Sequence, residues 1–256
     1  MKLTSTIFTT PKKGGYVSEN EDYYFPKEPT IKRDHHSVAI SDGASEGFMS
    51  RLWSKVLTIC YVNWDTTEVN IPEYIDFCIE IYEIQKQKYL KKREMENKPL
   101  KWFEENLMAK GSFATLLGLS FVDSKTKGGH WKSYSIGDSC LIQLRENIIT
   151  IFPKMNSNSF TNNPNLISTN PNYNKNIQPQ IKTGEWRNGD TFYLMTDAIA
   201  NWFHQEIEQE RKPWTIIDQF IENNKQGLNQ FIAYLREAKK LKNDDVTIAR
   251  VQIHED

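Results

Sequence analysis

Hydrophobic and polar positions change their period several times along the chain. Short runs of β type come first, at residues 3–9, 23–25 and 37–41, with Pro and Gly between them. Apolar residues then recur every three or four positions over residues 49–64 and 71–89. This spacing predicts two amphipathic helices after the first strands.

The middle of the chain returns to β-type patterning. Four runs are expected as strands, at residues 113–122, 131–136, 140–144 and 148–152. Gly128-Gly129, Gly137-Asp138 and Glu146-Asn147 separate these runs, and such pairs are typical of the turns of antiparallel hairpins. Residues 153–180 are rich in Asn and Pro and poor in apolar side chains, so we expect a long surface loop or flap there.

The last third of the chain mixes strands with helices. An apolar run at 191–196 predicts a buried strand, two helices are expected near residues 213–221 and 228–241, and a strand at 246–253 ends the pattern. Division at residue 153 would leave an incomplete sheet on each side. We therefore expect a single α+β domain over residues 1–256.

Composition narrows the function classes. The 256 residues carry 32 Lys and Arg against 33 Asp and Glu, a net charge of −1, which argues against a dedicated polyanion binder. No stretch approaches the ~18–20 apolar residues of a membrane helix, and the start lacks the apolar block of a signal peptide. The three cysteines have no CxxC spacing. These features predict a cytoplasmic protein with neither nucleic acid nor membrane as partner.

Acidic residues collect where predicted strands begin or end. Asp42 and Asp197 each follow an apolar strand and a hydroxyl residue, and each precedes a small residue. The acids that precede strands are Glu21, Asp22, Asp244 and Asp245. Antiparallel strands begin beside the ends of their neighbours, so these acids are expected along one sheet edge. Gathered carboxylates repel one another unless cations neutralise them, and oxygen ligands favour Mg²⁺ or Mn²⁺ over zinc.

The order of these motifs resembles the PP2C-type metal-dependent serine/threonine phosphatases, and in particular their divergent bacterial members, from about residue 14 to 253. The motifs concerned are Asn20-Glu21-Asp22, Ser41-Asp42-Gly43, Gly111-Ser112-Phe113-Ala114, Ser135-Ile136-Gly137-Asp138-Ser139, Gly189-Asp190, Leu194-Met195-Thr196-Asp197 and Asp244-Asp245-Val246-Thr247. The resemblance implies a PP2C-like α-β-β-α sandwich, in which helix pairs flank two antiparallel sheets.

The resemblance also implies a site for two Mn²⁺ or Mg²⁺ ions, with a third, weaker ion beside Asp138. Asp42, Asp197 and Asp244 are the implied catalytic set, with Asp42 bridging the two ions. The implied metal ligands, direct or through water, are Glu21, Asp22, Asp42, Gly43, Asp138, Asp197 and Asp244. The implied activity is hydrolysis of phospho-Ser/Thr by a metal-activated bridging water, on a phosphorylated protein and in opposition to a cognate kinase.

Four positions depart from the family pattern. Val17 stands where the family has a phosphate-binding Arg, and the other departures are Ala44, Ala198 and Asp245. The cations considered as substitutes for that Arg are Lys12, Lys13, Arg33 and Arg51, and no residue is assigned to substrate binding. These departures leave two alternatives open. One is a catalytically silent module that binds a partner or a phosphopeptide, and the other is a two-metal hydrolase of small phosphoesters.

Overall fold

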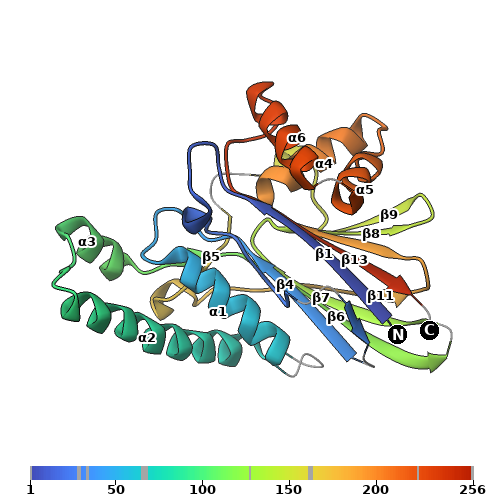
Figure 1. Ribbon diagram of the computed structural model, residues 1–256. Coiled ribbons are helices and arrows are strands. Elements are labelled where there is room, and N and C mark those ends of the chain that lie inside the picture. Colours follow the sequence, from blue (N-terminus) through green and yellow to red (C-terminus); the bar gives the residue numbers. More distant parts are fainter. Residues whose placement is uncertain are drawn as a thin grey trace.

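Two antiparallel sheets lie face to face with helices on their outer sides (Figure 1). The computed structural model describes residues 2–27, 30–32, 35–64, 69–126, 128–160, 164–223 and 225–254. None of the helices in these ranges is long and apolar enough to cross a membrane.

The elements have the following bounds. The strands of the larger sheet are β1 (Lys2–Thr10), β3 (Thr30–Lys32), β8 (Cys140–Arg145), β9 (Ile148–Phe152), β12 (Thr191–Met195) and β13 (Val246–His254). The strands of the second sheet are β2 (Tyr23–Phe25), β4 (His35–Ser41), β6 (Leu116–Thr126), β7 (Gly128–Ile136) and β11 (Gln180–Trp186). A small third sheet pairs β5 (Phe113–Ala114) with β10 (Ile167–Ser168). The helices are α1 (Ser50–Asn63), α2 (Ile71–Met95), α3 (Trp102–Lys110), α4 (Asp197–Glu208), α5 (Pro213–Asn223) and α6 (Lys225–Glu237).

The order of the strands determines where the two ends of the chain and the acidic motifs lie in the sheets. The larger sheet runs β3–β1–β13–β12–β8–β9 and the second runs β11–β7–β6–β4–β2. The first and last strands pair along their whole length, from Lys2 opposite His254 to Thr10 opposite Val246. The architecture is the α+β, four-layer α-β-β-α sandwich that the motifs predicted (Figure 1).

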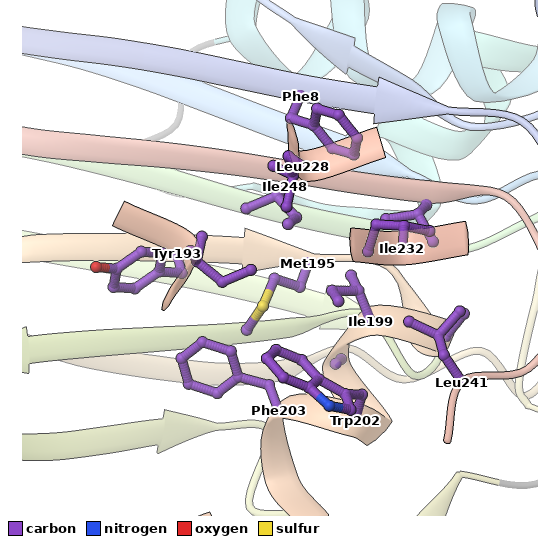
Figure 2. Packing of buried hydrophobic residues seen from close by; sticks show 14 of the residues in the cluster. Phe8, Tyr193, Met195, Ile199, Trp202, Phe203, Leu228, Ile232, Leu241 and Ile248 are labelled. Atoms are coloured by element: carbon purple, nitrogen blue, oxygen red, sulfur yellow. The ribbon is translucent and has the colours of Figure 1, made fainter. Parts of the chain in front are cut away.

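The continuous apolar run of β12 follows from its central place in the sandwich. Phe192 and Leu194 pack in the core between the two sheets. Tyr193 and Met195 point the other way, into the cluster beneath α4, α5 and α6 (Figure 2). Because successive side chains of a strand alternate in direction, a strand covered on both faces must be apolar throughout.

The second sheet is covered on its outer face by α1 and α2. Trp53, Tyr61, Tyr74 and Tyr82 of these helices are fully buried against it. The buried residues of α2 end at Tyr82, so its last three turns extend beyond the sheet together with α3 (Figure 1). The core therefore fixes only the first half of this helix.

One local expectation was wrong. The Gly137-Asp138 turn was predicted to close a hairpin, but β7 and β8 lie in different sheets, so the chain crosses from one sheet to the other there. A turn signal specifies a reversal but not the partner of the next strand. The loop predicted at 153–180 contains the short strand β10, whose Ile167 is fully buried in the core. The helix α3 and the strands β3 and β11 were not predicted.

Candidate metal centre

Both sheets contribute acidic residues to one end of the sandwich. Asp42 follows β4 and Asp22 precedes β2 in the second sheet, whereas Asp197 follows β12 and Asp244 precedes β13 in the larger sheet. The expectation of one shared sheet edge was therefore wrong. The acids come together because the two sheets stack with these strand ends on the same side.

A pocket of about 480 Å³ opens at this end. Its lining residues are Asp42, Gly43, Ala44, Ser45, Glu46, Lys110, Phe113, Thr115, Asp138, Pro164, Leu166, Asp197, Lys242 and Asp244. Five of the seven predicted site residues line it. The other two, Glu21 and Asp22, do not line it, and Asp22 is buried.

The backbone of Asp42 is held from both sides by one residue. Asp42 N donates to Thr115 Oγ1 at 2.9 Å, and Thr115 N donates to Asp42 O at 2.8 Å. The next residue, Gly43, has no room for a side chain, because a Cβ there would lie 2.7 Å from Ser54 Oγ and 2.9 Å from Glu21 O. Thr115 was not singled out in the sequence, and only its place beside the Gly-Ser-Phe-Ala motif marks it.

The carboxylates destabilise one another's charge. Burial raises the pKa of Asp42 well above its usual range, and the charges of Asp22, Asp197, Asp244 and Asp138 raise it further. Burial, together with the charge of Asp197, raises the pKa of Asp138 to about 7. Negative charge is therefore concentrated here beyond what the protein itself neutralises.

Asp22 is fixed between the two sheets. It is buried, and its Oδ2 accepts a hydrogen bond from Thr196 Oγ1 at 3.0 Å. Thr196 Oγ1 in turn accepts from Thr247 N at 2.9 Å, which joins the end of β12 to β13. The second oxygen, Asp22 Oδ1, is one of the buried side-chain atoms in the described residues that have no hydrogen-bond partner.

Asp197 and Asp244 share one cation. Lys242 Nζ lies 3.2 Å from Asp197 Oδ2 and 2.7 Å from Asp244 Oδ2. Burial disfavours the ammonium, but the hydrogen bond to Asp244 and the charges of both acids outweigh it and raise the pKa of Lys242. Arg236 of α6 supports the same loop, since its Nη2 donates to Asp244 O at 2.6 Å. Neither cation was predicted, because a Lys in a polar loop or an Arg near the end of a helix carries no local signal.

The carboxylate of Asp245 accepts hydrogen bonds from the loop before β2 and does not line the pocket. Its Oδ1 accepts from Lys12 N at 2.8 Å and its Oδ2 from Glu21 N at 2.7 Å, and the residue is buried. An aspartate at this position therefore provides two acceptors for two backbone N–H groups, where an asparagine side chain would provide one oxygen.

Asp245→Asn is expected to lower the free energy of unfolding by about 1–2 kcal/mol, because one buried N–H loses its acceptor. Urea denaturation measures the change. Asn243→Asp, on the exposed side of the same loop, is the matched control and is expected to change the free energy of unfolding by less than about 0.5 kcal/mol. Equal stability of Asp245→Asn and the wild type would contradict the double-acceptor role.

The cations that could substitute for the missing Arg differ in the groups they contact. Arg51 is occupied by the loop backbone, because its Nη1 donates to the carbonyls of Val17 (3.0 Å) and Asn20. Lys13 pairs with exposed Glu237 at 3.3 Å, and Arg33 lies outside the described residues. Lys12 reaches the pocket edge, where its Nζ donates to Ser45 Oγ at 2.9 Å.

Glu21 is linked to the same edge of the pocket through Ser45, whose hydroxyl donates a hydrogen bond to Glu21 Oε2. Burial raises the pKa of Glu21, although the hydrogen bond from Ser45 and the charge of Lys12 act in the opposite direction. Glu21 is therefore connected to the pocket by a hydroxyl rather than placed in it.

The donor set fits a divalent cation in its chemistry. All candidate ligands are oxygens, the neighbouring carboxylates raise the pKa of Asp42, and one buried carboxylate oxygen has no partner. In the part of the chain that the structure describes, no three His, Cys, Asp or Glu side chains are gathered closely enough to hold an ion as they stand. Lys242 lies between two of the candidates.

Solved structures with the same architecture include serine/threonine phosphatases. Mycobacterium tuberculosis PstP is similar with a TM-score of 0.57 and 16% identity, over 100% of each chain. The PstP catalytic domain in complex with two manganese ions has a TM-score of 0.56 and 16% identity, over 99% of this chain and 100% of that one. RsbX in complex with magnesium has a TM-score of 0.52 and 13% identity, over 98% of this chain and 95% of that one.

These similarities define the fold as that of the PP2C-type serine/threonine phosphatases. No protein-family model matches the sequence, and no curated protein matches it. The resemblance drawn from the motifs is thus confirmed at the level of the fold.

Proposed function

We propose that the protein is a Mn²⁺- or Mg²⁺-dependent phosphatase that hydrolyses phospho-Ser/Thr in proteins. The observation that carries this proposal is the group of four carboxylates, Asp42, Asp138, Asp197 and Asp244, which two different sheets and the turn joining them bring to one pocket. The PP2C fold, and the manganese and magnesium bound by similar structures, support it. A cytoplasmic phosphoprotein substrate and an opposing Ser/Thr kinase belong to the same proposal.

In this proposal Asp42, Asp197 and Asp244 hold two ions, and Asp138 serves a third, weaker one. The chemistry that bound divalent ions supply is a lowered pKa for water and neutralisation of phosphoryl charge. The chain's own residues shape the rest. Thr115 fixes the Asp42 backbone, and Phe113, Pro164 and Leu166 give the pocket an apolar wall next to Lys110. A phosphorylated side chain fits such a pocket because its charge meets cations and its carbon chain meets apolar groups.

The test compares substrates and metal in one assay. Wild-type protein is expected to hydrolyse a phosphothreonine peptide with Mn²⁺ and to lose this activity in EDTA. Asp197→Asn is expected to lower the rate at least about tenfold, because a direct ligand is lost. Faster turnover of nucleotides than of phosphopeptides would contradict the substrate class, and equal rates with Mn²⁺ and EDTA would contradict metal dependence.

A silent binding module is the second candidate, and two observations favour it. Val17, at the position of the phosphate-binding Arg, is 73% exposed, and Lys242 occupies the oxygens of two candidate ligands. Calorimetry separates the two candidates. Phosphopeptide binding without Mn²⁺ binding at millimolar concentration, and without hydrolysis, would establish the module.

A further inference from the structure

Lys242 makes polar contacts with two of the carboxylates that line the pocket. Its ammonium touches a carboxylate oxygen of Asp197, at the start of α4, and one of Asp244, which precedes β13. Lys242 and Asp244 belong to one short loop, while Asp197 is 45 residues earlier in the chain. The lysine therefore ties together two strand ends that would otherwise present like charges to each other.

The position of Lys242 is fixed on the backbone as well. The loop that carries it is held by Arg236, which donates to the carbonyl of Asp244. Asp244 is also tied to the next residue, since Asp245 N donates to Asp244 Oδ1 at 3.0 Å. Lys242 lines the same pocket as Asp42. Its ammonium thus bridges two of the carboxylates of the proposed metal centre.

We propose that Lys242 is a built-in cation that holds Asp197 and Asp244 together in the metal-free protein and competes with a divalent ion for them. This inference rests on the proposed function for the identity of the ion. An ion bound directly to these carboxylate oxygens, at about 2.0–2.1 Å for Mg²⁺, would bring a double positive charge within a few ångströms of the ammonium and repel it. Lys242 is therefore expected to move away when the ion binds.

The lysine side chain is suited to this exchange. It is 53% exposed, so water can solvate the ammonium once it is released. Exposure also keeps each ion pair weak, so a doubly charged ion can displace it. The released ammonium stays at the pocket, because the Lys242 side chain is attached there. It is then available to bind a phosphate group in place of the Arg that is absent at position 17. Ion binding and phosphate binding are then coupled through one residue.

The test is Mn²⁺ binding to Lys242→Met, which keeps the apolar stem and removes the charge. Isothermal titration calorimetry is expected to show Mn²⁺ binding about fivefold tighter than in the wild type, because the competing cation is gone. Lys240→Met, an exposed lysine two residues earlier, is the matched control and is expected to bind like the wild type. Equal or weaker Mn²⁺ binding by Lys242→Met would overturn the competition.

Thermal unfolding supplies an independent readout. In EDTA, Lys242→Met is expected to melt at a lower temperature than the wild type, because Asp197 and Asp244 then repel each other without a cation. In saturating Mn²⁺ this difference in melting temperature between Lys242→Met and the wild type is expected to disappear or reverse. A variant that is less stable by the same amount in both conditions would show that Lys242 is merely structural and would overturn the proposal.

The two proposals fail in different ways. If wild type and Lys242→Met bind Mn²⁺ equally and the wild type hydrolyses phosphopeptide, the role of Lys242 is wrong and the proposed function stands. If neither protein binds Mn²⁺, the metal centre itself is wrong and the role of Lys242 falls with it.

Discussion

Asp42→Asn is expected to lower Mn²⁺-dependent hydrolysis of a phosphothreonine peptide by at least about a hundredfold. The charge of Asp42 is disfavoured by Asp22 from the second sheet and by Asp197 and Asp244 from the larger sheet, so it lies where the two halves of the site meet. The amide cannot carry the negative charge that a bridging ligand needs, whereas the backbone contacts to Thr115 remain intact. Steady-state rates with Mn²⁺ measure the loss.

The same substitution is expected to lower activity but to raise the stability of the metal-free protein. In EDTA, Asp42→Asn is expected to melt at a higher temperature than the wild type, because a charge that burial and four neighbouring acids disfavour has been removed. Asp76→Asn, on the exposed side of α2, is the matched control and is expected to leave both activity and melting temperature unchanged. Loss of activity together with a lower melting temperature in EDTA would indicate misfolding instead of a lost ligand.

Asp190→Ala is expected to destabilise the fold by about 3–4 kcal/mol without any direct role in the pocket. Asp190 is 1% exposed, and its carboxylate accepts from Gln143 Nε2 at 2.8 Å and from Arg145 Nε at 2.8 Å and Nη2 at 2.7 Å. It also accepts from Arg187 N at 3.0 Å. Removing it takes an acceptor from Gln143 and Arg145 of β8 and from the turn before β12, and leaves Gln143 and Arg145 only the carbonyl of Glu185.

Urea denaturation of Asp190→Ala measures this effect. Glu185→Ala is the matched control, because the pair of Glu185 with Arg187 is exposed and its atoms are 3.9 Å apart. Its loss is expected to cost less than about 0.5 kcal/mol. A similar small effect in both variants would show that the Asp190 network contributes little to the fold.

Several elements could be predicted from the sequence because their causes are local. The helices at 50–63 and 213–223 follow from apolar spacing, and β12 from a continuous apolar run. The acidic residues that line the pocket stand at strand ends, where the chain must turn and where Asp is favoured. For these residues the position along the chain already indicated a common place in the fold.

Other features depend on which segments meet in space. Gly137 and Asp138 turn the chain whether the next strand stays in the same sheet or crosses to the other, and only the two packed sheets decide between them. Asp245 stands beside the predicted ligand Asp244 in the sequence, yet the loop packed against it uses both of its oxygens. Such partners come from more than 200 positions away, and no local pattern records them.

The charge at the site shows the same division. The sequence by itself determined which acids end and begin the strands, because turn chemistry and strand periodicity are properties of neighbouring residues. Only the tertiary structure decided that these acids come from two sheets, that Thr115 fixes Asp42, and that Lys242 bridges Asp197 and Asp244. The physical reason is that electrostatic and hydrogen-bonded contacts act through space, between groups that stacking of the sheets brings within a few ångströms.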